Sequence, residues 1–172
     1  MKVALLSALA YKPQLLVLDE PFAGLDGWVR EELIKGVLEL AEQDHWSVLV
    51  SSQDIDEVEQ LADQIGVLDE GELILCESTE YLLHRFRRVE VTTAQITKWP
   101  ENMRPSWILP ESTGHRFSFL CTDYKEGTTE EELRALFPAA THIGSTKVDL
   151  QQITVALGRS AAGRRAGGVS CD

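Results

Sequence analysis

A short apolar run followed at once by two carboxylates constrains the fold of this chain more than any other feature. Leu15–Leu18 are all aliphatic, and Asp19 and Glu20 come directly after them. A continuous apolar run of this length predicts a strand that is buried on both faces of a parallel sheet. Pro21 ends the strand, and Gly24 permits a tight turn beyond it. Because open α/β sheets bind their ligands at the carboxyl ends of strands, the carboxylates are candidate site residues.

Asp19 and Glu20 suit two different tasks. Neighbouring side chains of a strand point to opposite sides, so one carboxylate can hold a metal ion through water while the other polarises a nucleophile. The alternative is a strand followed by a charged turn without a chemical role. The short apolar-Asp-Glu pattern leaves that alternative open, but the whole string from Leu15 to Asp26 favours a site.

This string resembles the Walker B motif and D-loop of the ATP-binding subunits of ABC transporters. The resemblance implies that Asp19 positions a magnesium ion and that Glu20 is the catalytic residue that orients the attacking water. Gly24, Leu25 and Asp26 would form the D-loop, whose aspartate lies across the dimer interface in that family.

The resemblance extends on both sides of the string. Ser47–Ser52 is similar to the next core strand, residues 53–58 to the switch-loop segment, and Ala62–Gly71 to the final core strand and its turn. Residues 2–13 are similar to the helix that follows the signature loop of the family. The match therefore covers residues 1–76 almost without a gap.

No P-loop precedes Asp19 in this sequence. In the family, the backbone amides and the lysine of that loop hold the nucleotide phosphates. The nearest formal match, residues 158–165, has the glycine spacing but lacks the final lysine and hydroxyl, and we interpret it as a basic tail. The signature motif would end just before Met1, so the chain resembles the C-terminal half of an ATPase that begins at an internal methionine.

Gln53 stands where the family has a histidine that contacts the terminal phosphate of the nucleotide. Glutamine still donates an amide hydrogen bond, but it carries no charge and does not titrate near neutral pH. The resemblance therefore implies a weakened catalytic contact. The alternative is a polar residue ahead of a helix, but the position directly after Ser51-Ser52 at a strand end favours the switch role.

Charge and cysteine content exclude several classes of protein. The net charge of −12 argues against a nucleic-acid-binding protein, which needs clustered Lys and Arg. Cys76, Cys121 and Cys171 lie far apart, which predicts reduced thiols rather than a disulfide framework or a zinc site. No apolar stretch approaches the ~18 residues that span a bilayer. We expect a cytoplasmic protein that reaches the inner face of the membrane through a partner.

Strands and helices alternate in the first part of the chain, which predicts a doubly wound parallel α/β sheet. The resemblance makes it an incomplete P-loop NTPase-type sheet, because the P-loop strand of the family would lie between strands 48–51 and 65–68. Its absence would leave unpaired backbone groups and an uncovered apolar surface. The helix at 28–42 is expected to bury one apolar stripe, formed by Val29, Leu33, Val37, Leu40 and Ala41. Asp54 with Glu57 predicts a capping box at the start of the next helix.

The pattern changes to α+β after the core. We expect the ATPase core to span residues 1–78, a linker helix 79–88, a small accessory domain 89–158 and a disordered tail 159–172. The accessory domain would contain strands at 89–93, 116–121 and 141–146, a loop at 109–112 and a closing helix that ends at Gly158. It resembles the appendage of many bacterial ABC exporter ATPases.

The resemblance implies Mg-ATP as cofactor, with a second ATPase subunit and a membrane-spanning permease subunit as partners. The implied function is export that is energised by ATP hydrolysis in paired subunits. Without a P-loop, the chain alone is expected not to bind ATP usefully, so its own enzymatic activity stays open. The alternatives are a non-catalytic module that pairs with an intact ABC subunit and, less favoured because of the acidic charge, a DNA-acting ABC ATPase. No residue specifies a transported substrate.

Overall fold

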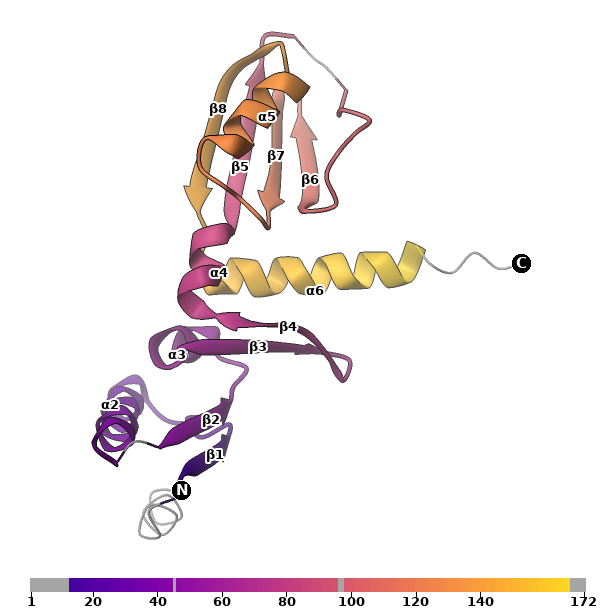
Figure 1. The fold of residues 1–172 in the computed structure, drawn as a ribbon. Helices are drawn as coiled ribbons and strands as arrows, with labels where there is room; N and C mark the ends of the chain where they lie inside the picture. The colour runs from indigo at the N-terminus through magenta and orange to yellow at the C-terminus, as the bar shows by residue number, and fades with distance from the viewer. Residues whose placement is uncertain (1–12, 45, 96–97, 168–172) are drawn as a thin grey trace. The chain divides into compact units, whose positions relative to one another are not determined.

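The computed structural model describes residues 13–44, 46–95 and 98–167, and the chain divides into two compact units, residues 1–62 and 63–172 (Figure 1). The sequence predicts a first domain that extends to residue 78. That boundary stays a prediction, and the strands that follow Ala62 pair with each other in the sheets of the second unit. The mixture of parallel and antiparallel sheets is compatible with a fragment of a P-loop NTPase-type fold followed by an α+β region.

The first unit is built around one β-α-β crossover. Strand β1 pairs in parallel with β2 in a register that places Leu15 opposite Ser47 and Asp19 opposite Ser51. Such a pair requires a long connection, which a helix provides. The elements are β1 (Leu15–Asp19), α2 (Gly27–Asp44), β2 (Ser47–Ser51) and α3 (Ile55–Leu61). The helix predicted at residues 2–11 lies outside the described residues.

The buried face of α2 differs slightly from the predicted stripe. Ile34 and Val37 are its most buried residues, whereas Leu40 is 36% exposed. Residues 34, 37 and 41 follow one line along a helix of 3.6 residues per turn, and this line leaves Leu40 at the margin. The prediction that Leu40 is a core residue is therefore wrong.

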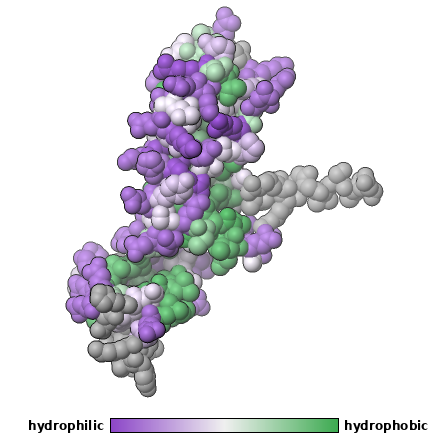
Figure 2. Space-filling view, in the orientation of Figure 1, coloured by the Kyte–Doolittle hydropathy of each residue, from purple (hydrophilic) through white to green (hydrophobic). Residues whose placement is uncertain are grey.

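In the part of the first unit that the structure describes, one face of the parallel sheet carries exposed apolar side chains. Leu16 is buried, but Leu15 and Val17 are 54% and 62% exposed, and Leu49, which is opposite Val17 in register, is 59% exposed. The prediction of a strand buried on both faces is thus wrong for the described residues, because every second side chain of β1 is exposed. Figure 2 shows apolar surface over this unit. We call Leu15, Val17 and Leu49 the open face.

The second unit begins with a hairpin. Strands β3 (Gln64–Asp69) and β4 (Glu72–Ser78) pair antiparallel across the turn Glu70-Gly71. Glu70 and Gly71 have φ angles of 48° and 83°, the left-handed conformation that both central residues of a type I′ turn adopt. The hairpin and β2 belong to separate sheets.

A four-stranded antiparallel sheet in the order β6-β7-β5-β8 follows, with α5 across one face (Figure 1). Helix α4 ends at Arg85, so Arg87 and Arg88, expected in the linker helix, begin β5. Aromatic and aliphatic side chains of the sheet and of α5 form one core, including Val89, Phe117, Phe119, Leu133 and Phe137. The elements are α4 (Thr79–Arg85), β5 (Arg87–Thr93), β6 (Trp107–Thr113), β7 (Arg116–Cys121), α5 (Thr128–Leu136) and β8 (Ala140–Lys147).

Strand β6 replaces the loop predicted at 109–112. The strand accommodates Pro110 because its pairing with β7 is irregular between Ile108 and Glu111, where Leu109 has a φ of 51°. Bulges on edge strands are among the few places where a sheet accepts proline.

The closing helix α6 (Leu150–Gly167) is longer than predicted. Its first turn is capped by Asp149, whose carboxylate accepts a hydrogen bond of 2.7 Å from the Gln152 amide. The predicted end at Gly158 is wrong, and residues 159–167, expected in a disordered tail, are helical. Alanine and arginine, which are frequent there, are strong helix formers, and the internal glycines Gly158 and Gly163 each cost only about 1 kcal/mol. Among the described residues, no helix is long and apolar enough to cross a membrane.

Candidate functional site

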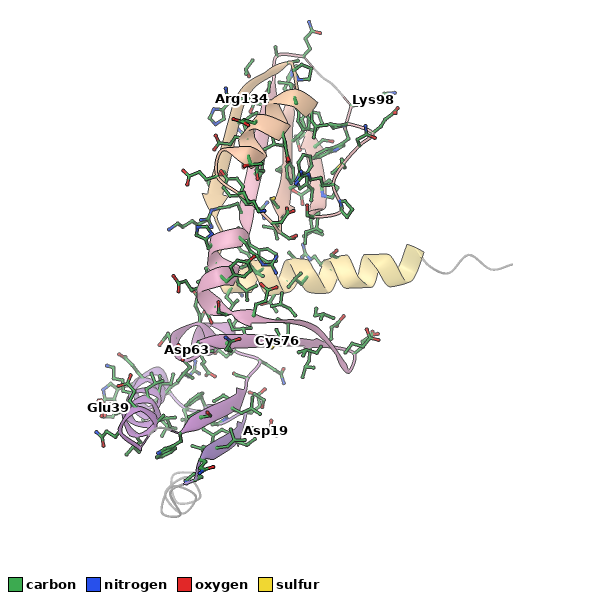
Figure 3. The ribbon with its side chains drawn as sticks, viewed as in Figure 1. Asp19, Glu39, Asp63, Cys76, Lys98 and Arg134 are labelled. Carbon is green, nitrogen blue, oxygen red and sulfur yellow. The ribbon has the colours of Figure 1, made fainter. Side chains whose placement is uncertain are left out.

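The candidate site lies where β1 and β2 end side by side. Asp19 and Ser51 are register partners at the last position of each strand, and the Ser51 hydroxyl donates a hydrogen bond to the Asp19 carboxylate. The side chain of Asp19 is exposed, and Figure 3 places it at this end of the sheet. An exposed carboxylate held by a neighbouring hydroxyl is a suitable oxygen ligand for a hard cation such as Mg²⁺.

Glu20 follows β1 in a left-handed conformation with a φ of 45°. Its amide donates to the Ser51 carbonyl at 3.0 Å and to the Ser51 hydroxyl at 3.2 Å, so β2 holds this turn in place. The left-handed region costs a non-glycine residue about 1–2 kcal/mol, and such strain is concentrated at functional sites. Because β1 ends at Asp19, the alternation of a regular strand does not extend to Glu20, and the division of tasks between the two carboxylates stays a prediction.

The predicted D-loop is a series of turns between β1 and α2. The Leu25 amide donates to the carbonyl of the fully buried Phe22 at 3.2 Å, and Gly24 takes a φ of 75° that few other residues adopt. Asp26 is the N-cap of α2, because its carboxylate accepts a 3.0 Å hydrogen bond from the Val29 amide. The structure therefore gives Asp26 a capping role within this chain.

Gln53 lies between β2 and α3 with its side chain exposed. The next residue, Asp54, caps α3 by accepting from the Asp56 amide at 3.2 Å. The other half of the predicted capping box is wrong, because Glu57 turns inward and accepts a 2.8 Å hydrogen bond from the Ser52 hydroxyl. Gln53 is thus flanked on both sides by residues with defined contacts.

Sequence reasoning missed the cation that joins these elements. Arg30 of α2 lies 3.0 Å from Asp54, through Nη1 and Oδ2, and 3.0 Å from Glu57, through Nε and Oε1. Glu57 is only 4% exposed. A buried carboxylate requires a partner. Glu57, an acidic residue on the side of α3 that faces inward, was therefore the signal in the sequence that a cation lies nearby.

The described residues contain no group of three or more His, Cys, Asp or Glu side chains arranged to hold a metal ion. This donor set fits Mg²⁺ only in part, since Asp19 can supply one carboxylate. Mg²⁺ commonly keeps several waters and takes one or two carboxylates together with substrate phosphates. Asp19 would therefore hold magnesium together with a nucleotide and not as an isolated ion.

A groove of about 450 Å³ lies within the second unit and contains none of these residues. It is lined mainly by apolar side chains, among them Leu73, Leu75 and Leu157, together with Glu77 and Arg85. The last two form a bidentate ion pair with both distances at 2.8 Å, so their charges are already matched within the protein.

No protein-family model matches the chain. It is 41% identical over 99 residues, 58% of its length, to the "Energy-coupling factor transporter ATP-binding protein EcfA" of Methanothermobacter thermautotrophicus, of which it covers 30%. It is 25% identical over 141 residues, 82% of its length, to the "Energy-coupling factor transporter ATP-binding protein EcfA2" of Staphylococcus epidermidis, of which it covers 46%. It is 34% identical over 91 residues, 53% of its length, to the "Uncharacterized ABC transporter ATP-binding protein YhaQ" of Bacillus subtilis, covering 30%.

The chain thus spans less than half the length of each of these relatives. All of them carry the name of a transporter ATP-binding protein. These homologues of the chain are ATP-binding proteins of ABC transporters, which supports an ABC ATPase domain.

Proposed function

We propose that this chain is part of the ATP-binding subunit of an ABC transporter, in which paired subunits hydrolyse ATP to energise transport. One observation carries the proposal. Asp19 and Ser51 meet at the carboxyl ends of two parallel strands, and Glu20 follows in a strained turn. Ligands of open α/β sheets bind at this kind of position. The similarity to ABC transporter ATP-binding proteins supports ATP as that ligand.

The residues would divide the work in the following way. Asp19 would hold Mg²⁺ through water, and when bound the ion would neutralise phosphate charge. Glu20 would accept a hydrogen bond from the attacking water and orient it, while its backbone stays anchored to Ser51. Gln53 would donate an amide hydrogen bond to the terminal phosphate, and Gly24, Leu25 and Asp26 would face the second subunit.

The chain alone would bind Mg-ATP poorly. Asp19 and Glu20 are anionic and repel a triphosphate unless cations or backbone amides offset their charge. No P-loop occurs in this sequence. The phosphate-binding amides and lysine would therefore come from another segment of the complete ATPase.

The partners would be a second ATPase subunit and a membrane-spanning permease, which would keep the complex at the cytoplasmic face of the membrane. We propose export as the direction of transport, because the region from residue 89 resembles the accessory domain of exporter ATPases.

A non-catalytic module that pairs with an intact ABC subunit is the second candidate. Gln53 in place of a histidine and the lack of a P-loop favour it. A DNA-acting ABC ATPase is less favoured, since the net charge of −12 opposes binding to a polyanion.

Turnover by a fusion protein separates the two candidates. The chain would be joined behind the P-loop half of an ABC ATPase, and ATP binding and hydrolysis would be measured with Glu20 and with Glu20→Gln. We expect the substitution to lower kcat by about 10²-fold or more and to preserve ATP binding. A fusion that binds ATP but has no activity that depends on Glu20 would favour the non-catalytic module.

A further inference from the structure

Arg30 connects the start of α2 with the segment that carries Gln53. Its backbone amide donates to the carbonyl of Asp26 at 3.0 Å, within the first turn of α2. Its guanidinium extends to Asp54 and Glu57, each at 3.0 Å, at the start of α3. The Arg30 side chain therefore joins the helix that Asp26 caps to Asp54 and Glu57, which lie 24 and 27 residues further along the chain.

The switch segment is fixed on both sides of Gln53. The Ser52 hydroxyl donates to the buried Glu57 carboxylate at 2.8 Å and accepts from the Asp54 amide at 3.1 Å. Asp54 in turn contacts Arg30. Gln53 itself is exposed, so its position depends on these two neighbours and not on packing of its own side chain.

The chemistry of this cluster differs from that of an ordinary surface ion pair. The pair of Lys35 and Glu31 lies on the same helix, with side chains 62% and 60% exposed, and such pairs contribute little. Glu57 is buried, and a buried carboxylate that loses its cation is strongly unfavourable. The planar guanidinium of Arg30 serves two carboxylates at once, which a lysine ammonium does less well.

We propose that Arg30 is a positioning residue that holds Gln53 at a fixed place relative to Asp26, through Asp54, Glu57 and Ser52. In the proposed function, Gln53 contacts the nucleotide and Asp26 faces the second subunit. Arg30 then makes the switch segment and the D-loop move as one body. The importance of Gln53 in this inference rests on the proposed function, whereas the cluster itself does not.

Hydrogen–deuterium exchange on the full chain tests the cluster directly. We expect Arg30→Gln to speed amide exchange at residues 52–58 by about 10²-fold, because Glu57 loses its cation. Exchange in the second unit should not change. Lys35→Gln, on the same helix, is the matched control and should leave residues 52–58 as protected as before. The double variant Arg30→Gln, Glu57→Gln removes the buried charge and should restore most of the protection.

Two outcomes would overturn the proposal. One is unchanged exchange at residues 52–58 in Arg30→Gln, and the other is faster exchange spread evenly over residues 13–62, which would make Arg30 a general stabiliser. If Arg30→Gln prevents folding, Arg30→Lys replaces it. That variant keeps the charge but loses the forked, planar geometry of the guanidinium. Amide exchange at residues 52–58 should still be about tenfold faster. No local change in Arg30→Lys would contradict the inference.

Turnover by the fusion protein then tests the positioning role. Arg30→Lys should lower kcat at least tenfold with an unchanged KM for ATP, and Lys35→Gln should alter neither constant. Equal kcat values for Arg30→Lys and the unmodified fusion would refute positioning. A fusion that lacks activity without any substitution would instead refute the proposed function and leave the exchange result intact.

Discussion

The two units of this chain cover their sheets to different degrees. In the second unit, α5 and a four-stranded antiparallel sheet enclose side chains such as Phe117 and Phe119. In the first unit, a two-stranded parallel sheet leaves the open face of Leu15, Val17 and Leu49 exposed. Parallel sheets are normally covered on both faces. The second unit therefore carries its own core, whereas the described part of the first unit leaves one face of its sheet exposed.

The candidate site lies in the less covered unit. Short-range polar contacts define its geometry, such as the hydroxyl of Ser51 with Asp19 and the guanidinium of Arg30 with Glu57. These contacts do not require the open face to be covered. The local geometry of a site can thus be complete where the core around it is not.

Removal of a core aromatic should have the largest effect and should be confined to the second unit. Phe119 is buried and stacks on Trp107 with ring centroids 4.5 Å apart. We expect Phe119→Ala to lower the free energy of unfolding of this unit by about 3–5 kcal/mol. Urea denaturation followed by near-UV circular dichroism measures it. Leu73→Ala, at an exposed position of the hairpin, is the control, and similar effects of both would contradict the assigned core.

The switch position should have the next largest effect, and it concerns the first unit alone. In the fusion with a P-loop half, Gln53→His should raise kcat by about 10²-fold, because one well-placed donor to a transition state is worth that much. Gln60→His, at an exposed position of α3, is the matched control and should leave kcat unchanged. If Gln53→His is no faster under saturating Mg-ATP, Gln53 is not the switch residue.

Equivalent helix caps allow a direct comparison of the two units. Asp26 caps α2 and Asp149 caps α6, each by accepting one backbone amide hydrogen bond. Asp26→Ala and Asp149→Ala should each cost about 1 kcal/mol of stability, and the Asn variants should cost less. Thermal unfolding of both pairs measures this. A loss confined to Asp149→Ala would show that the cap at Asp26 does not stabilise the first unit.

The open face should affect association more than stability. Expressed alone, the chain should be poorly soluble or oligomeric, because Val17 and Leu49 are exposed side by side. The double substitution Val17→Ser, Leu49→Ser should change the free energy of unfolding by less than about 0.5 kcal/mol. Sedimentation velocity should show fewer large species. A monodisperse chain before substitution would show that the open face does not drive association.

Local signals in the sequence predicted most elements of the fold. The aliphatic run Leu15–Leu18, for example, lies within β1, the strand that it predicts. The errors have physical causes. Pro110 is accommodated by a bulge in β6, and Gly158 by the strong helix formers around it. Burial of both faces of β1 failed as a prediction because burial depends on what packs against a strand, which no local pattern contains.

The site was predicted less completely than the fold. Asp19, Glu20 and Gln53 are placed at strand ends, where the motif expects them, but their chemical roles stay predictions. Arg30 was missed because its partners are distant in the sequence, and no spacing rule links an arginine on one helix to carboxylates on another. The left-handed turn at Glu20 was also missed, because glutamate does not favour that conformation.

Calorimetric titration with Mg-ATP tests most directly whether the first unit is an ATPase portion that needs a separate phosphate-binding segment. We expect no micromolar binding to the chain alone, because Asp19 and Glu20 repel the triphosphate, and clear binding once a P-loop half is fused ahead of it. Micromolar binding to the unfused chain would contradict the need for a separate phosphate-binding segment and would indicate a phosphate site elsewhere in these residues.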